Sequence, residues 1–286
     1  MQYPWKAVIF DMDGTLACSM GVWRKIDIQF LDRRGIVMPD DYGAALRTMS
    51  YQEAAAYTIS RFSLPETIPD VIREWHEMAV FEYGHTIELK DGAKEFIEAL
   101  RKQGVKIALA TVSSRELYEP FLRNKGIYQY FDVCVDTSQV QRGKGYPDIY
   151  LFAVQELSRS LEHPIAPSDC IVFEDVLQAV QAARSGGFQT CGVYDSSSDE
   201  EWSAIQMAAD MTIESFTQLL WMGGSETCNC KRTKCRRHGK CSECIAYHRA
   251  NKRYRTPHCM RLGQKATENN GSSGVEFGEK GEGANV

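Results

Sequence analysis

The sequence lacks long apolar runs. None of its hydrophobic stretches approaches the roughly 18 residues that a membrane-spanning helix needs. The start of the chain, around Trp5 and Lys6, also lacks the charged region followed by an apolar stretch that marks a signal peptide. With 43% hydrophobic and 25% charged residues, the composition is that of an ordinary globular protein. We therefore expect a cytoplasmic protein of one large or two modest domains, with no membrane partner.

Cysteine is scarce in the first 220 residues and concentrated near the end of the chain. Of the four early cysteines, Cys134, Cys170 and Cys191 lie in strand-like runs, where we expect them to be small buried hydrophobic side chains. The other six cysteines lie between residues 228 and 259. In a chain without a secretion signal, such a cluster is more typical of a metal site than of disulfides.

A basic Cys-rich module is predicted over residues 225–262. Between residues 228 and 262 there are eleven Lys or Arg and one Glu, a net charge of +10, whereas the rest of the chain carries −15. The short Cys and His spacings predict a tetrahedral Zn²⁺ site, and an iron–sulfur cluster is the alternative for the same thiolates. The candidate ligands are Cys228, Cys230, Cys235, His238, Cys241, Cys244 and Cys259.

The charge of this module leaves two interpretations open. Its basic residues, together with Tyr247 and Tyr254, suit nucleic-acid binding through phosphates and stacking, which would make the chain a binding or regulatory protein. Alternatively, the basic face offsets thiolate charge or docks on the acidic remainder of the chain, and we favour this second interpretation. Residues 263–286, with six Gly and a single aromatic residue, are predicted to be a disordered tail.

Apolar strands and amphipathic helices alternate through residues 1–16 and 89–222. Short buried strands that alternate with helices are typical of a parallel sheet covered on both faces. The pattern predicts an α/β fold with a Rossmann-like, doubly wound parallel sheet. The predicted strands cover residues 7–10, 106–110, 131–135, 170–173 and 189–193, and the predicted helices cover residues 91–103, 114–125, 147–158 and 176–185.

Residues 17–88 interrupt this alternation and are predicted to be wholly helical. Trp23, Ile26, Phe30 and Leu31 follow the spacing of the apolar face of an amphipathic helix. We expect this segment to form a helical cap over the carboxyl ends of the strands, where open α/β sheets bind ligands. The candidate contacts with a substrate are Trp23, Arg24, Arg47 and Tyr51.

Two carboxylates follow the first predicted strand, in the run Asp11-Met12-Asp13-Gly14-Thr15. A carboxylate at the strand end can attack phosphorus and form an aspartyl-phosphate. The second carboxylate, two residues later, suits general acid and base chemistry, and Gly14 permits a tight turn. The alternative is an ordinary acidic surface loop. The functional interpretation of this motif therefore depends on other candidate site residues elsewhere in the sequence.

Glu174 and Asp175 follow a second buried strand-like run, residues 171–173. Together with Asp11 and Asp13 they form a candidate Mg²⁺ site, because Mg²⁺ binds a few carboxylates with water and phosphate oxygens. A cation is needed, since a carboxylate about 4 Å from a phosphate is repelled by about 4 kcal/mol per charge pair at an effective dielectric constant of about 20. The alternative is that both acids stabilise the start of the following helix.

Lys144 and the segment Thr111-Val112-Ser113 are the candidates for phosphate binding. Lys144 lies in a glycine-bounded loop before a predicted helix, and taken alone it is typical of a solvated surface lysine. Thr111 follows a predicted strand, where a hydroxyl and the backbone N–H groups of Val112 and Ser113 make an anion site at a helix start. Ser113 or Ser114 also suits the N-cap of that helix, and the two roles are compatible.

These elements resemble the signature of the haloacid dehalogenase-like hydrolases. The match comprises the runs 11–15 and 173–175 together with Thr111 and Lys144, and it covers about residues 1–220. The helical cap resembles that of the branch containing β-phosphoglucomutase and phosphoglycolate phosphatase. The resemblance implies that Thr111 and Lys144 hold the transferring phosphoryl group.

The resemblance also assigns roles to the acids. It implies that Asp11 is the nucleophile, which Lys144 also orients, and that Asp13 is the general acid and base. It implies further that Asp11, Asp175 and the backbone carbonyl of Asp13 bind Mg²⁺, with help from Glu174. Because dehalogenases lack the second acid, Asp13 favours phosphoryl transfer.

The chain departs from the family pattern at Val112, Tyr146, Val176 and Ala179, and the first two of these reshape the predicted substrate pocket. In the mutase, a cap histidine falls twelve positions after the nucleophile, where this chain has Trp23. We therefore predict a Mg²⁺-dependent phosphatase that acts on a small phosphorylated metabolite, such as a sugar phosphate or a phosphoglycolate-like ester. A phosphosugar mutase of the β-phosphoglucomutase type is the alternative, and the sequence does not specify an oligomeric state.

Overall fold

The computed structural model describes residues 3–46, 49, 51–159, 161–224, 235–237, 244 and 247. Contacts divide the chain into two compact units, residues 1–224 and 225–286. In the second unit, Cys235 and Cys244 are half-buried, and the Arg237 guanidinium lies 3.6 Å from the ring centroid of Tyr247. The other predicted zinc ligands, the predicted disordered tail and Arg47 lie outside the described residues, so those predictions stay predictions.

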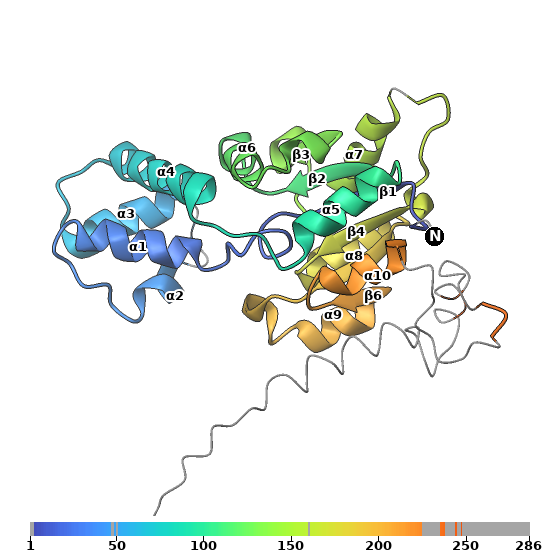
Figure 1. The fold of residues 1–286 in the computed structure, drawn as a ribbon. Coiled ribbons are helices and arrows are strands. Elements are labelled where there is room, and N and C mark those ends of the chain that lie inside the picture. Colours follow the sequence, from blue (N-terminus) through green and yellow to red (C-terminus); the bar gives the residue numbers. More distant parts are fainter. Residues whose placement is uncertain are drawn as a thin grey trace, which may run out of the picture. The chain divides into compact units, whose positions relative to one another are not determined.

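In the described part of the chain, six parallel strands form a sheet in the order β3-β2-β1-β4-β5-β6 (Figure 1). β1 lies between β2 and β4, and Phe10 of β1 is in register with Leu109 and Phe173. The strand order changes direction at β1, and this is the position where open α/β sheets form a crevice at their carboxyl ends. The strands are β1 (Ala7–Phe10), β2 (Lys106–Thr111), β3 (Val133–Asp136), β4 (Cys170–Glu174), β5 (Gln189–Val193) and β6 (Met211–Ile213).

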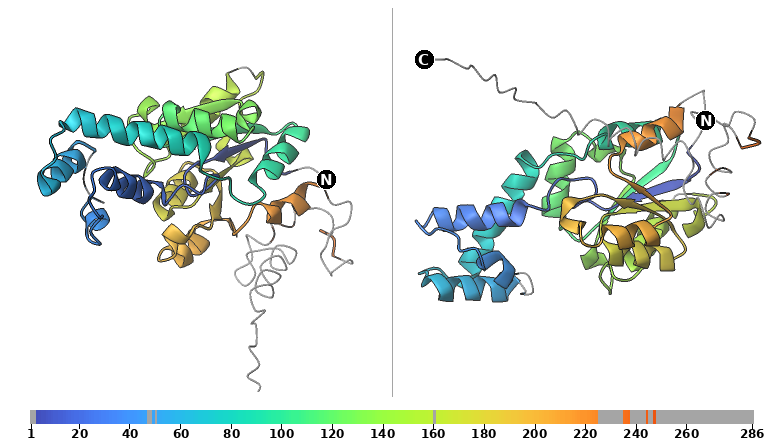
Figure 2. Two further views of the ribbon diagram at one scale, coloured as in Figure 1. Left: turned by 60° about the vertical axis from the view of Figure 1, so that its left-hand side comes forward. Right: turned by 90° about the horizontal axis from the view of Figure 1, so that it is seen from below.

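Helices cover both faces of this sheet (Figure 2). On one face, α7 (Asp148–Ser158) and α8 (Leu177–Ser185) pack on small and branched strand residues. On the other face, α5 (Ala93–Lys102) and α10 (Thr217–Gly224) frame an aromatic cluster of Phe10, Phe96, Phe173 and Phe216. Full burial of each such side chain contributes roughly 1.5–3 kcal/mol to the stability of the fold. The remaining helices of this region are α6 (Arg115–Asn124), α9 (Trp202–Ala208) and the 3₁₀ turns Tyr128–Tyr130, Thr137–Gln139, Pro167–Asp169 and Ser196–Ser198.

The predicted doubly wound parallel sheet is confirmed. β1 and β5 have the predicted bounds, and β2 and β4 each run one residue further. The helix predicted from residue 91 begins at Ala93, because Gly92 has a φ of +73°, which a helix cannot contain. The strand predicted from residue 131 begins at Val133, after a 3₁₀ turn. The short elements β6, α9 and α10 are not predicted by the sequence pattern.

Four helices occupy residues 17–88, here called the helical insertion: α1 (Val22–Asp32), α2 (Tyr42–Leu46), α3 (Tyr51–Phe62) and α4 (Ile68–His85). α4 packs against both α1 and α6. The predicted apolar stripe on α1 is wrong at Trp23, which is 40% exposed, whereas Val22 is buried with Ile26 and Phe30 at a spacing of four residues. None of the helices in the described ranges is long and apolar enough to span a membrane.

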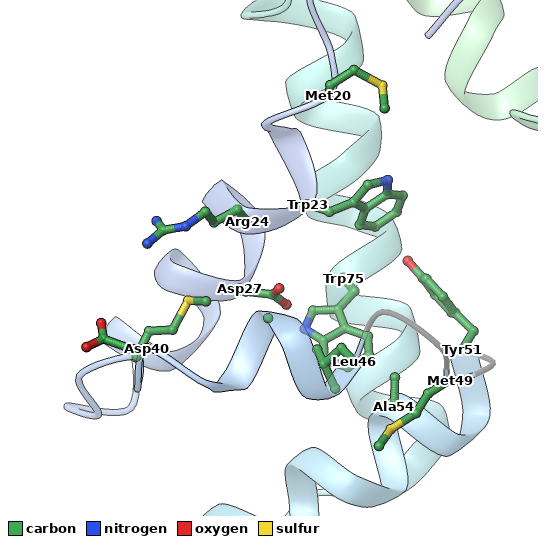
Figure 3. Close-up of a pocket in the computed structure, with 12 residues that line it drawn as sticks. Met20, Trp23, Arg24, Asp27, Asp40, Leu46, Met49, Tyr51, Ala54 and Trp75 are labelled. Carbon is green, nitrogen blue, oxygen red and sulfur yellow. The ribbon is translucent and has the colours of Figure 1, made fainter. Parts of the chain in front are cut away.

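The helical insertion borders a cavity of about 670 Å³ (Figure 3). Trp23, Tyr51 and Trp75 form a row of edge-to-face ring contacts along it, with centroids 5.8 Å apart in each pair. Asp27 lines the same cavity from α1, and it forms no hydrogen bond or ion pair with the residues that the structure describes. Burial raises the pKa of Asp27 from 3.8 to about 6. The cavity therefore combines aromatic walls with charged groups, among them an Asp27 carboxylate that has no partner among the described residues.

The unpaired Asp27 carboxylate should lower stability at neutral pH. Because its pKa is higher in the folded protein than in the unfolded chain, the folded protein holds this proton more tightly, and the free energy of unfolding falls as the pH rises from about 4 to 6. Asp27→Asn removes this loss, so the variant should have a higher Tm than the wild type at pH 7 and a similar Tm near pH 4. Thermal unfolding at the two pH values checks the expectation. Asp32→Asn, an exposed position on the same helix, should change neither Tm, and an equal gain from both variants would contradict the prediction.

Candidate active site

The central position of β1 brings three strand ends together. Asp11 directly follows β1, and its backbone N–H donates to the Phe173 carbonyl of β4 at 3.0 Å. Glu174 and Asp175 come at the end of β4, and Thr111 ends β2 on the other side of β1. All of these side chains are buried. The sheet topology thus assembles, at one edge, the polar residues that the sequence predicts for the site.

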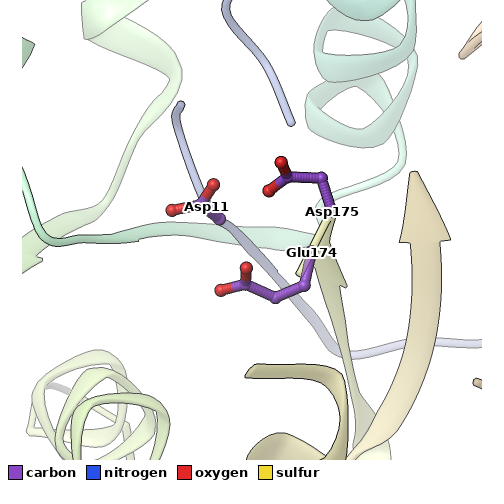
Figure 4. Close-up of side chains that lie close together, drawn as sticks. All are labelled: Asp11, Glu174 and Asp175. Atoms are coloured by element: carbon purple, nitrogen blue, oxygen red, sulfur yellow. The ribbon is translucent and has the colours of Figure 1, made fainter. Parts of the chain in front are cut away.

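Asp11, Glu174 and Asp175 form an acidic cluster (Figure 4). Each offers a carboxylate oxygen, and these oxygens lie within 4.8 Å of one another. Burial raises the pKa of Asp11, and burial together with the Asp11 charge raises the pKa of Glu174 to about 7 and that of Asp175 to about 8. Three crowded carboxylates in a low-dielectric site cannot all ionise near neutral pH without added positive charge.

The residues of the cluster fit a divalent metal ion. Asp175 Oδ1 accepts a hydrogen bond from the Thr15 hydroxyl at 3.2 Å, whereas Oδ2 is buried without a partner among the described residues. Gly14, at a φ of +79°, leaves this oxygen room, because a Cβ there would lie 2.1 Å from Asp175 Oδ2. Buried carboxylate oxygens, one of them unsatisfied, are the ligands that a hard cation such as Mg²⁺ prefers.

The alternative that these acids only stabilise the next helix does not fit the structure. The N-cap of α8 is Val176, which makes no side-chain capping bond, and the first turn contains no acidic residue. Glu174 and Asp175 instead face the Asp11 carboxylate. Their position is therefore explained by the acidic cluster.

Lys144 brings a positive charge to the acidic cluster. Its ammonium group forms an ion pair with Asp11 and donates to Glu174 Oε1 at 2.7 Å, and its side chain is only 11% exposed. Burial lowers the pKa of Lys144, but the two carboxylates outweigh burial and raise it above its ordinary value. The Tyr150 hydroxyl donates to the same Glu174 oxygen at 2.7 Å. Lys144 is thus a buried partner of the acids, and Tyr150 is a member of the site that the sequence analysis missed.

Asp13 lies among three hydroxyl groups. Ser19 and Tyr83 donate to its Oδ1 at 2.6 and 2.5 Å, and Ser113 donates to its Oδ2 at 2.7 Å. Ser19 precedes α1 and Tyr83 lies near the end of α4, so two donors come from the two ends of the helical insertion. Sequence reasoning missed both of them. Their signal was weak, because isolated Ser and Tyr residues in a helical segment are ordinary.

The predicted phosphate-binding segment is only partly in its expected arrangement. Thr111 Oγ1 is buried and accepts from the Ser113 N–H at 3.0 Å, so its O–H proton is available to another acceptor. Val112 is 58% exposed, and it offers polar contacts through its backbone alone. Ser113 is not the helix N-cap, since that position is held by Ser114 without a side-chain bond, while the Ser113 hydroxyl contacts Asp13. Of the predicted substrate contacts, Trp23, Arg24 and Tyr51 line the cavity of the helical insertion.

Gly14→Ala should disable the metal site. The new Cβ would collide with Asp175 Oδ2, in addition to the roughly 1–2 kcal/mol that a left-handed conformation costs a residue with a side chain. We expect Mg²⁺ affinity, measured by titration calorimetry, to fall at least about tenfold. Gly35→Ala isolates the backbone cost, because Gly35 has a φ of +70° and no atom near its virtual Cβ. If both variants bound Mg²⁺ as tightly as the wild type, the assigned role of Gly14 would be wrong.

Comparisons with known proteins agree with this geometry. A family model described as haloacid dehalogenase-like hydrolase matches residues 5–187. The phosphorylated carbohydrates phosphatase of Thermotoga maritima is 27% identical over 184 residues, which cover 64% of this chain and 82% of the relative. The validoxylamine A 7′-phosphate phosphatase of Streptomyces hygroscopicus subsp. limoneus is 26% identical over 217 residues, which cover 76% of this chain and 97% of the relative.

Solved structures show the same likeness. A putative β-phosphoglucomutase from Thermotoga maritima has a TM-score of 0.64 at 25% identity, with 74% of this chain and 94% of that chain covered. CbbY from Rhodobacter sphaeroides in complex with phosphate has a TM-score of 0.59 at 27% identity, with 75% and 96% covered. The family model spans more than half of the chain, and the acidic cluster lies at the strand ends where the resemblance placed it. The chain therefore belongs to the haloacid dehalogenase-like hydrolases.

Proposed function

We propose that this chain is a Mg²⁺-dependent phosphatase that hydrolyses small phosphomonoesters through an aspartyl-phosphate on Asp11. The observation that carries the proposal is that Asp11 forms an ion pair with Lys144 and lies within 4.8 Å of the Glu174 and Asp175 oxygens, with Asp13 two residues away. The named phosphatases among its relatives support this reaction class. The proposal includes the substrate class of this chain, small phosphomonoesters.

The metal ion has a defined set of candidate ligands. Asp11, Asp175 and the backbone carbonyl of Asp13 would hold Mg²⁺, with Glu174 nearby to hold Lys144 in place. When bound, the ion supplies positive charge that offsets the repulsion between the anionic nucleophile and the phosphate. Lys144 adds positive charge through its ion pair with Asp11, and the Thr111 hydroxyl is available to donate to a phosphoryl oxygen.

In the first half of the reaction, an oxygen of the Asp11 carboxylate attacks phosphorus. The bond between phosphorus and the alcohol oxygen breaks, and the departing oxygen takes a proton from the protonated Asp13 carboxyl. In the second half, Asp13, now ionised, takes a proton from water as that water attacks the aspartyl-phosphate. The bond between phosphorus and Asp11 breaks, inorganic phosphate leaves and both acids return to their starting states.

The helical insertion is assigned the role of a cap over this site. Residues 17–88 would form the cap, and residues 1–16 with 89–222 would form the core. Isolated backbone bridges join Ala17 to Asp13 on one side and to Leu89 on the other, so both connections of the insertion run beside the catalytic loop. The hydrogen bonds of Ser19 and Tyr83 to Asp13 support the same assignment, because they couple the acid to the segment that would cover it.

A phosphosugar mutase is the second candidate, because a putative β-phosphoglucomutase is among the structures that this chain resembles. Trp23 is the residue at the position of the mutase's cap histidine in the sequence resemblance, and an indole cannot act as a base. Release of inorganic phosphate distinguishes the two reactions, since a mutase returns the phosphoryl group to the sugar.

Asp11→Asn should abolish phosphate release. An amide is not a competent nucleophile toward phosphorus, so we expect a loss of at least about a thousandfold, together with the loss of phosphoenzyme trapped by acid quench. The measurement is a phosphate-release screen over metabolite phosphates, with and without a chelator of Mg²⁺. Asp32→Asn serves as the charge-matched control and should be fully active. Retained activity in Asp11→Asn would refute the mechanism, and interconversion of glucose phosphates without net phosphate release would favour the mutase.

Tyr83→Phe should lower kcat by about tenfold with little change in KM. The hydroxyl contacts Asp13 and lies outside the acidic cluster, so its removal affects proton transfer rather than the binding of phosphate. Steady-state kinetics on the best substrate of the screen separates the two constants. Tyr42→Phe is the matched control, because it removes another buried tyrosine hydroxyl of the insertion, one that is hydrogen-bonded to Thr58. Equal effects of the two variants would show that Tyr83 acts only through folding.

A further inference from the structure

The cavity of the helical insertion contains groups that the phosphoryl chemistry does not use. Trp23 and Tyr51 are each about 40% exposed beside it, and the Trp75 ring packs against Tyr51. Most other lining residues are apolar, among them Met20, Met38, Leu46 and Met49. Exposed aromatic faces and adaptable methionines suit a flat apolar ligand better than a polyol, which would need several hydrogen-bonding partners.

Two polar groups of the cavity wall that are at least partly buried have no hydrogen-bond partner among the described residues. Trp75 is only 4% exposed, and its buried indole N–H has no hydrogen-bond acceptor among the described residues. The Asp27 carboxylate has no donor, and in Figure 3 the indole nitrogen and the carboxylate are turned toward the same region. A buried polar group without a partner costs free energy, so its retention indicates a ligand that completes it.

The distance between this pair and the catalytic acid restricts the ligand. Tyr83 contacts Asp13, and Trp75 lies eight residues before Tyr83 on the same helix, α4. At 1.5 Å per helical residue, the separation is about 12 Å. An alcohol of two or three carbons is too short to reach from the phosphate to Trp75. A ring carried on a sugar or a similar spacer covers this length, and the cavity volume of about 670 Å³ is that of a site for a ligand of drug-like size.

We propose that the cavity binds a planar nitrogen heterocycle on the leaving alcohol, so that the substrates are phosphomonoesters of nucleoside-like alcohols. The ring lies against Trp23 and Tyr51, its N–H groups donate to the Asp27 carboxylate, and a ring acceptor receives the Trp75 N–H. The inference rests on the proposed function, since it assigns the leaving group of that same reaction. It also gives a reason for an aspartate that has no partner among the described residues.

Matched substrates test the proposal. Nucleoside 5′-monophosphates carry the heterocycle, and ribose 5-phosphate is the same phosphorylated sugar without it. The wild type should hydrolyse at least one nucleotide with a kcat/KM about tenfold or more above that of ribose 5-phosphate. Asp27→Asn should remove most of this preference without changing the rate on ribose 5-phosphate, and Asp32→Asn should change neither. Equal rates on both substrate types, or a higher rate on phosphocholine, would overturn the proposal.

A binding measurement separates this inference from the reaction itself. Unphosphorylated nucleosides should quench the tryptophan fluorescence of the full-length wild type, because Trp23 and Trp75 line the cavity. Asp27→Asn should weaken this binding at least about fivefold, while Asp32→Asn should not. Binding of nucleosides without any phosphate release would support the cavity assignment and refute the phosphatase. Phosphate release from ribose 5-phosphate without nucleoside binding or nucleotide preference would support the phosphatase and refute the cavity assignment.

Discussion

The electrostatic balance around Asp11 is the constraint on which the site depends. Three carboxylates, Asp11, Glu174 and Asp175, are buried at one edge of a parallel sheet. Desolvation raises the pKa of each, and the Asp11 charge adds to the rise for Glu174 and Asp175. Lys144 provides one compensating charge through its contacts with two of them. Asp175 Oδ2 is buried without a partner among the described residues, so a second positive charge would stabilise the cluster. This excess of negative charge fits a bound cation, and the sheet topology that gathers the acids is what creates it.

Backbone geometry at the first loop makes the cluster possible. Gly14 has a conformation that favours glycine, and its missing side chain is the space in which Asp175 Oδ2 lies. The same loop directs Asp13 away from the cluster toward the hydroxyls of Ser19, Tyr83 and Ser113. The two acids of one short motif therefore occupy different environments, one crowded by charge and one surrounded by neutral donors. Such a difference suits a nucleophile and a proton shuttle.

The helical insertion connects recognition to this chemistry. Its two chain connections lie beside Asp13, and its interior carries the aromatic cavity with the unpaired Asp27. If the cavity holds the leaving alcohol as proposed, residues of the insertion select the substrate, at a distance from phosphorus that only an extended leaving group covers.

The sequence by itself determined the parallel α/β fold and indicated the acids and the threonine at the strand ends, because strand-end positions and local periodicity are short-range features. The place of Lys144 in the site came from the family resemblance, since taken alone it is typical of a surface lysine. The tertiary structure alone decided their partners. Tyr83 lies 70 residues from Asp13, and Ser113 lies 100 residues from it, so no local pattern indicates either contact. Packing also decided that Trp23 faces a cavity rather than the core of the insertion, a choice that helical spacing cannot make between two adjacent apolar residues. Periodicity locates the face of a helix, and only the neighbouring elements determine what that face meets.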